Sequence, residues 1–195
     1  MEQFFLDLRP AIVEAVRTEM EKIRAAAGDE RIYAAALVTD SDCITLFLAV
    51  NTEESLAWRD RKDRTAKRLD TLRQYWDGAL VDQVANGSFS LNRYLPDEWG
   101  YSDSKGSGLN QISKQLYDKE ASLSGADEYD EAHEQFQDQF LETVALAFED
   151  LRAEGVFGPE VTCFISMSDD DRAEEIEDSS ARRLNAPAQY EQLRT

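Results

Sequence analysis

Two apolar runs that lie close together in the chain limit its possible folds more than any other feature. They are Ile32–Val38 and Cys43–Val50, and the polar residues Asp40-Ser41-Asp42 separate them. Runs of this length with turn-forming residues between them are typical of a β-hairpin. We therefore predict strands at 32–39 and 43–50. Because both runs are almost continuously apolar, we expect a sheet that is covered on both faces or packed tightly by helices.

Most of the remaining chain has the apolar spacing of helices. Apolar side chains recur at steps of three and four in residues 2–27 and again in 127–153, which is the pattern of one apolar stripe on a helix. A third strand is expected at 161–167, after Gly158-Pro159. The prediction is an α+β fold in which several helices pack a small antiparallel sheet of three or more strands. The other expected segments are helices at 53–75, 79–84, 109–123 and 186–194, and an otherwise irregular stretch at 77–108.

The chain length and the apolar stripes together predict one core. With 195 residues, of which 42% are hydrophobic, the chain is long enough to bury a single core. We see no internal repeat and no linker, so one globular domain over 1–195 is expected. The predicted core consists of Phe5, Ile12, Val16, Leu37, Leu46, Leu48, Phe140, Val144, Phe148 and Phe164.

The chain is strongly acidic, with 40 Asp and Glu residues against 21 Lys and Arg and a formal net charge of −19. Such an excess repels nucleic acid and anionic membranes and attracts basic partners. An acidic surface that serves only solubility is the alternative interpretation. Residues 59–73 form the one basic segment. A basic helix can bind phosphate or RNA, but the acidic residues nearby favour pairing of its charges within the molecule.

Cysteine usage and hydropathy predict where the protein resides. Cys43 and Cys163 each lie inside an apolar run, which favours buried free thiols and a reducing cytosol, with a single disulfide as the alternative. The N-terminal residues lack the basic region and long apolar core of a signal peptide. No run approaches the roughly 18 apolar residues of a membrane span. We therefore expect a soluble, cytoplasmic protein.

The residues needed for common catalytic and metal sites are scarce. His133 is the only histidine, so the usual transition-metal sites and the nucleophilic sites that depend on histidine cannot be assembled. No glycine-rich segment fits a phosphate-binding loop. Asp169-Asp170-Asp171 could hold a divalent cation but lacks the spacing and the glycine of a calcium loop. We expect no catalytic residue, no cofactor and no metal site, and an enzyme is the least favoured class.

Five short segments occur in a characteristic order. They are Tyr33-Ala34-Ala35-Ala36-Leu37-Val38-Thr39-Asp40, Asn51-Thr52-Glu53-Glu54, Pro96-Asp97-Glu98-Trp99-Gly100-Tyr101, Glu154-Gly155-Val156-Phe157-Gly158 and Ser179-Ser180-Ala181-Arg182-Arg183-Leu184-Asn185. In this order they resemble a bacterial family of small proteins that is classed only as a domain of unknown function. The chain departs from the family pattern at Leu95 and Ser179. The family is similar to proteins often encoded near secreted bacterial toxins, and this resemblance implies an immunity-type role.

Two functional hypotheses follow. The first is a cytoplasmic immunity protein that neutralises a basic toxin domain, because an acidic inhibitor gains fast electrostatic association. The second is an acidic regulatory or housekeeping binding protein with no toxin partner. The candidate partner-binding residues combine acids of the C-terminal region with rings of the 93–101 loop. Such rings can form a binding spot, but they more often fix a long loop to the core, and that interpretation is favoured. They are Asp169, Asp170, Asp171, Glu174, Glu175, Asp178, Trp99 and Tyr101.

Overall fold

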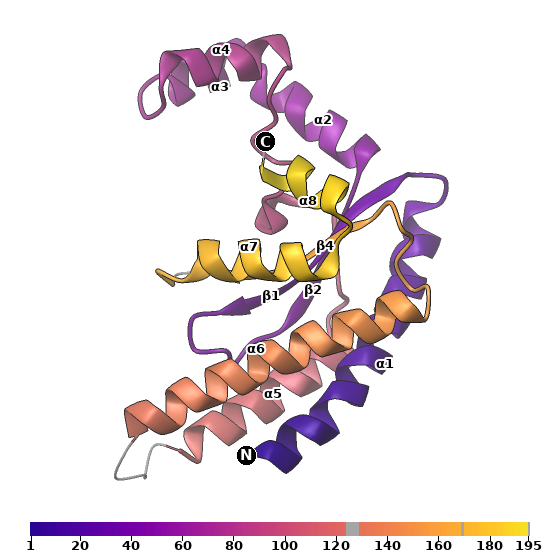
Figure 1. The fold of residues 1–195 in the computed structure, drawn as a ribbon. Coiled ribbons are helices and arrows are strands. Elements are labelled where there is room, and N and C mark those ends of the chain that lie inside the picture. Colours follow the sequence, from indigo (N-terminus) through magenta and orange to yellow (C-terminus); the bar gives the residue numbers. More distant parts are fainter. Residues whose placement is uncertain (124–128, 169, 195) are drawn as a thin grey trace.

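The computed structural model describes residues 1–123, 129–168 and 170–194 (Figure 1). Helices lie on both sides of a small central sheet. In chain order the elements are α1 (Glu2–Ala27), β1 (Ile32–Asp40), β2 (Phe47–Thr52), α2 (Glu53–Asp63), α3 (Ala66–Leu72), α4 (Gly78–Asn86), the 3-10 helix η1 (Pro96–Glu98), β3 (Tyr101–Ser102), α5 (Gly108–Ala121), α6 (Tyr129–Ala153), β4 (Thr162–Ser168), α7 (Ala173–Leu184) and α8 (Pro187–Arg194).

The sheet has the strand order β3-β2-β1-β4. The predicted α+β class and the predicted hairpin are confirmed, because β1 pairs with β2 in antiparallel register. The prediction of an antiparallel sheet is wrong for the late strand. β4 runs parallel to β1, from Ala34 opposite Thr162 to Asp40 opposite Ser168. The sheet is therefore mixed.

Helix packing explains why β4 is parallel to β1. α1 leads into β1 and α6 leads into β4, and the two helices lie side by side (Figure 1). They run in the same direction, since Phe5 contacts Phe136 near their starts and Arg24 donates to the carbonyl of Val156 beyond their ends. Both strands therefore enter the sheet from the same end. Parallel neighbours require such a crossover connection.

The two faces of the sheet carry different packing. α1, α5 and α6 cover one face, where Leu37, Leu48 and Ile165 are buried. The 92–99 loop, α7 and α8 contribute to the other, which buries Val38 and Phe164. Successive strand residues point to opposite faces, so each strand supplies side chains to both layers. All ten residues of the predicted core are buried.

Two element boundaries differ from the prediction for local reasons. β2 begins at Phe47 instead of 43, because Cys43 has a left-handed backbone with a φ of 58°. The predicted helix 53–75 is divided into α2 and α3 at Thr65, whose backbone is extended and whose hydroxyl donates to the Lys62 carbonyl at 3.0 Å. The sequence analysis did not predict α7, β3 or η1.

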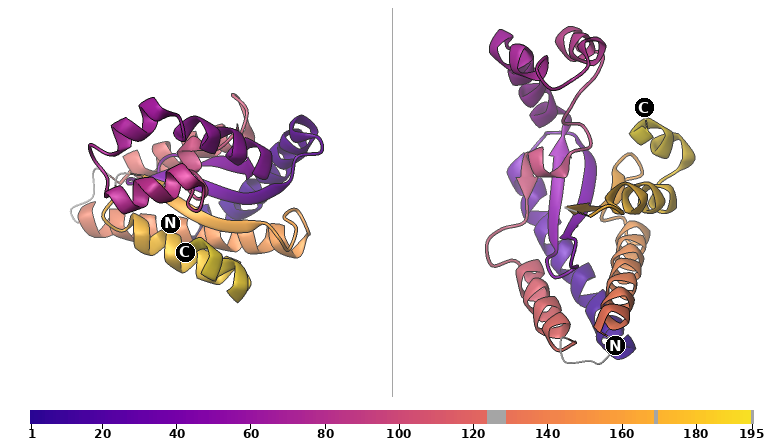
Figure 2. Two further views of the ribbon diagram at one scale, coloured as in Figure 1. Left: turned by 90° about the horizontal axis from the view of Figure 1, so that it is seen from above. Right: turned by 90° about the vertical axis from the view of Figure 1, so that its left-hand side faces the viewer.

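Residues 53–92 form an arm that projects from one end of the sheet (Figure 2). Within it, α3 and α4 pack on α2 and on each other. The arm has a small apolar cluster of its own that consists of Leu72, Val81 and Val84. The helices α1, α5 and α6 extend toward the opposite end (Figure 2). None of the helices described is long and apolar enough to cross a bilayer.

Candidate functional site

Three of the short sequence segments meet in a polar cluster beside β1 and β2. The Tyr33 hydroxyl accepts from Nδ2 of Asn51 at 3.0 Å and donates to the Arg93 carbonyl at 2.6 Å. The backbone N–H of Gly100 donates to Oδ1 of Asn51 at 3.3 Å. Burial raises the pKa of the Tyr33 phenol, which keeps it neutral. Because these polar groups bind one another, the cluster holds the loop in place and does not present a reactive group.

The two aromatic residues predicted to bind a partner belong to this packed region. Trp99 is only 8% exposed and packs edge-on against Phe164, with ring centroids 5.7 Å apart. Its Nε1 donates to the Asn92 carbonyl at 3.2 Å. The Tyr101 hydroxyl donates to Glu30 at 2.9 Å. Trp99 thus has the loop-fixing role that the sequence favoured for these rings, and its ring is almost fully buried.

The predicted acidic residues are divided between internal contacts and the surface. Asp170 accepts from the backbone N–H of Arg172 at 2.7 Å, and this bond lowers the pKa of its carboxyl. Asp178 accepts from the Tyr190 hydroxyl at 2.6 Å and pairs with Arg182 at 3.1 Å. Asp169 lies outside the described residues. Three of the predicted acids are exposed, and their contact with a partner stays a prediction. They are Asp171, Glu174 and Glu175.

Side chains occupy the outer edge of β4. The N–H of Cys163 donates to Oδ1 of Asn185 at 2.8 Å, and Nδ2 of Asn185 donates back to the Cys163 carbonyl at 2.6 Å. One step along the same edge, the N–H of Ile165 donates to the Ser180 hydroxyl at 3.0 Å. Ser180 and Asn185 come from the last of the five sequence segments. These bonds satisfy backbone groups that an edge strand would otherwise present to another chain.

Side chains also bind two backbone N–H groups near the start of β2. The N–H of Leu48 donates to the Asp103 carboxylate at 3.1 Å, and that of Leu46 donates to the Ser113 hydroxyl at 2.9 Å. Partners that bind by adding a strand need free backbone groups at a sheet edge. These two backbone groups near β2, like those at the outer edge of β4, are therefore already bound within the chain.

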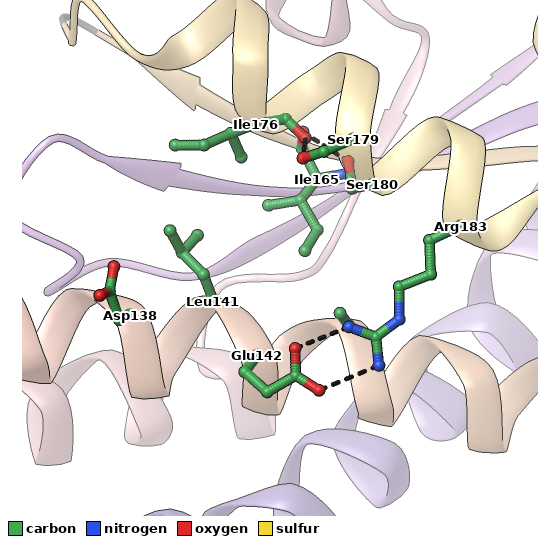
Figure 3. A pocket seen from close by; sticks show the side chains of 9 residues that line it. Asp138, Leu141, Glu142, Ile165, Ile176, Ser179, Ser180 and Arg183 are labelled. Carbon is green, nitrogen blue, oxygen red and sulfur yellow. Dashed lines mark hydrogen bonds and ion pairs between the residues drawn. The ribbon is translucent and has the colours of Figure 1, made fainter.

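Two grooves lie side by side along α6. The first groove lies between α6 and α7 and encloses about 310 Å³. Figure 3 shows Leu141 and Ile165 pointing into the space between the two helices. Its floor is apolar and its rim carries charged side chains. The groove is lined by Asp138, Leu141, Glu142, Ala145, Ile165, Ile176, Ser179, Ser180 and Arg183.

The second groove lies between α1 and α6 and encloses about 320 Å³. It shares Asp138 and Glu142 with the first groove. These two acids stand four residues apart, so they form one ridge on the helix with an apolar flank on either side. We call the two grooves and this ridge the double groove. The second groove is lined by Glu2, Phe5, Leu6, Arg9, Asp138, Gln139, Glu142, Thr143 and Leu146.

Ion pairs fix the helices that border the double groove. Arg183 on α7 binds both carboxylate oxygens of Glu142, at 2.6 and 3.0 Å (Figure 3). It also binds Glu149 at 2.7 Å. Arg9 on α1 binds both oxygens of Asp150 on α6, at 2.7 and 2.6 Å. These bonds raise the pKa of the Arg183 guanidinium and lower that of the Asp150 carboxyl. Both arginines are therefore engaged with α6, and Asp138 remains exposed on the ridge.

Most of the chain matches the model of one protein family. A family model with the description "Domain of unknown function (DUF4303)" matches residues 12–186. The protein belongs to the DUF4303 family. No curated protein and no solved structure matches this chain. The expectation of a family with unknown function is therefore confirmed.

The DUF4303 chain was predicted to contain buried free thiols, and the structure confirms this. Cys43 and Cys163 are free and buried, which excludes the disulfide alternative. Burial raises the pKa of each thiol to about 12, so neither is a ready nucleophile at neutral pH. Among the described residues, no group of three or more His, Cys, Asp or Glu side chains could hold a metal ion.

Sequence reasoning missed the double groove of this DUF4303 protein. A signal was present, because apolar residues occur beside the main apolar stripes of α1 and α6. Leu6 is next to the buried Phe5, and Leu141 and Leu146 lie between buried positions of α6. Leu6 is 61% exposed. Exposed apolar residues that gather at one surface are typical of interaction sites.

Proposed function

We propose that this DUF4303 protein is an immunity-type binding protein that neutralises a basic toxin domain in the cytoplasm. The observation that supports the proposal is the double groove, where apolar floors flank an acidic ridge. The toxin class of the partner rests on the sequence resemblance. The reducing compartment is supported by the two buried free thiols.

The double groove fits an amphipathic helix or loop with basic residues. Apolar side chains one helical turn apart on the partner would enter a groove, in the manner of helix-in-groove recognition. Lysine or arginine beside them would meet Asp138 on the ridge and Glu2 at the edge, both exposed. Leu6 and Leu146 would supply apolar contact, which mainly sets the dissociation rate. The net charge of −19 would accelerate association with a basic domain.

The experiment recovers the natural partner from the cells that make this protein. Tagged wild-type protein is compared with the double variant Leu6→Asp, Leu146→Asp, which places carboxylates in the second groove. Tyr117→Asp is the matched control, because Tyr117 is 58% exposed on α5. The wild type and the control should retain a basic partner that the double variant loses. Equal recovery by all three proteins would show that the double groove is not the contact surface.

A growth assay then separates the two functional hypotheses. The recovered partner is produced in cells without the DUF4303 protein, and growth is followed with and without wild-type protein supplied from a second promoter. A toxin partner should arrest growth, and wild-type protein should restore it while the double variant fails. Normal growth in the presence of the partner alone would favour the regulatory or housekeeping binding protein instead.

A further inference from the structure

Another groove lies on the arm, and we call it the arm groove. It encloses about 590 Å³ between α2, α3 and the 91–98 loop. Tyr75, Trp76 and Leu95 line it and are 80%, 45% and 45% exposed. Among the described residues only seven large hydrophobic side chains are exposed, so this one groove holds three of them. Exposed aromatic residues that gather in one groove are typical of a binding surface.

The arm groove is also bordered by cations. Arg59, Lys62 and Arg68 line it, and they belong to the one basic segment of an acidic chain. Arg68 pairs with Asp63 at 3.3 Å, and the Lys62 ammonium lies 3.5 Å from the ring centroid of Trp58. The expected internal pairing of this segment is therefore present. Arg59 also pairs with Glu98. The side chains of Arg59 and Arg68 are 34% and 53% exposed. Because each guanidinium has five N–H donors, it can bind an incoming carboxylate while it keeps its internal acid.

We propose that the arm groove binds an acidic protein segment that carries an aromatic or large aliphatic side chain. The apolar side chain would lie between Trp76 and Leu95, and its neighbouring carboxylates would pair with Lys62 and Arg68. Tyrosine, tryptophan and arginine are the residues that most often dominate the energy of such contacts. The complementarity of charge specifies the acidic character of the segment.

A nucleic acid fits the arm groove less well. Asp63 and Glu98 also line the groove, and they would meet the phosphates of a polyanion. The whole chain has a net charge of −19, which opposes binding of a long polyanion far more than binding of a short acidic segment. The arm lies at one end of the sheet, whereas α1 and α6, which border the double groove, extend toward the other end (Figure 2). The inference is therefore independent of the proposed function.

The test selects peptides from a displayed random library on the complete wild-type protein. We expect enriched peptides to be acidic and to contain an aromatic or large aliphatic residue. One enriched peptide is then synthesised with a fluorophore, and its affinity is measured by anisotropy. The double variant Tyr75→Ser, Trp76→Ser should bind it at least about tenfold more weakly. Because the side chains of Tyr75 and Trp76 are exposed, we expect this variant to keep the wild-type circular dichroism spectrum.

Charge variants and matched controls complete the test. Lys62→Glu with Arg68→Glu should slow association strongly at low salt and less at high salt. Lys105→Glu with Lys114→Glu changes the same charge at exposed sites outside the arm, and Tyr117→Ser removes an exposed ring elsewhere. Both controls should bind like the wild type. The proposal is overturned if no acidic peptide is enriched, if the arm variants bind unchanged, or if single-stranded oligothymidine binds the groove more tightly. A wild-type dimer that the Tyr75→Ser, Trp76→Ser variant abolishes would also overturn it, by assigning the groove to a second copy.

Discussion

Asn185 takes the place of a neighbouring strand at the outer edge of β4. It accepts from Cys163 and Arg152, each at 2.8 Å, and donates to the carbonyls of Cys163 and Ala181. Replacing it with Ala leaves several of these groups without partners, and we expect a loss of about 2–3 kcal/mol in the free energy of unfolding. Urea denaturation measures the loss. Gln189→Ala removes two exposed hydrogen bonds, one to the Pro159 carbonyl and one from the Ala186 N–H, and should cost less than about 0.5 kcal/mol. A loss below about 1 kcal/mol for Asn185→Ala would contradict the edge-closing role.

Glu177 should make stability depend on pH with the opposite sign to most carboxylates. Burial raises the pKa of its carboxyl above the ordinary value of 4.5, although the Ser166 hydroxyl donates to it at 2.6 Å. The folded chain thus holds this proton more tightly than the unfolded chain. Its contribution to stability is complete below pH 4.5 and is lost as pH rises through the folded-state pKa.

The substitution Glu177→Gln removes that ionisation and keeps an acceptor for Ser166. We expect the variant to be more stable than the wild type at pH 7, with the difference shrinking toward pH 4. Urea denaturation at both pH values provides the measurement. Glu175→Gln, on the exposed side of the same helix, should show no comparable pH dependence. A variant that is less stable than the wild type at pH 7 would mean that the ionised carboxylate is favoured in the folded protein.

At the scale of elements, the sequence predicted which side chains are buried more accurately than it predicted the direction of the strands. The apolar stripe of α6 identified Phe140, Val144 and Phe148 because a helix repeats its face every three or four residues. A short apolar run contains no comparable information about strand direction. The parallel course of β4 depends on the packing of α6 beside α1, a contact between residues far apart in the chain. The division between α2 and α3 was not predicted, because it occurs at the extended backbone of Thr65 and leaves no break in the apolar pattern.

The candidate site was less predictable than the fold. The sequence located acidic and aromatic residues, but it could not decide which of them the fold buries. Trp99 became a packing residue because it meets Phe164 from a distant strand. The double groove arises where three helices meet, so no single stretch of sequence describes it. Leu6 is an example. It lies at the border of the buried stripe of α1, and the sequence does not show whether a leucine at that position is buried or exposed.

The arm should open more readily than the other helical parts of the molecule. α3 has seven residues and buries only Leu72, and the apolar cluster of the arm is small. α1 and α6 have 26 and 25 residues and pack on the main core. Regions with few buried apolar contacts exchange amide hydrogens through local opening. We expect peptides from 66–86 to exchange deuterium faster than those from α1 and α6 in mass spectrometry. Equal protection would mean that the arm unfolds only together with the sheet.

At the scale of the whole molecule, repulsion between acids competes with ion pairs. The pairs that are described lie mostly at the surface, for example Arg9–Asp150 and Arg73–Asp70, where each contributes about 0–1 kcal/mol. The chain has 40 acidic and 21 basic residues, so the acids repel one another across the molecule even where some of them are paired. Self-repulsion of this kind destabilises a compact state. Added salt weakens both effects, so the sign of the salt dependence shows which one is larger.

We expect repulsion to be larger, so that stability at pH 7 rises with sodium chloride. Between about 0.01 M and about 1 M salt the Debye length falls from about 30 Å to about 3 Å, which screens repulsion across the acidic surface. Urea denaturation at each salt concentration measures the effect. The triple variant Glu21→Gln, Glu131→Gln, Glu134→Gln removes exposed acids and should start more stable at low salt and gain less from added salt. If the wild type loses stability as salt rises, ion pairs such as Arg183–Glu142 outweigh the repulsion, and the acidic surface carries no net cost to folding.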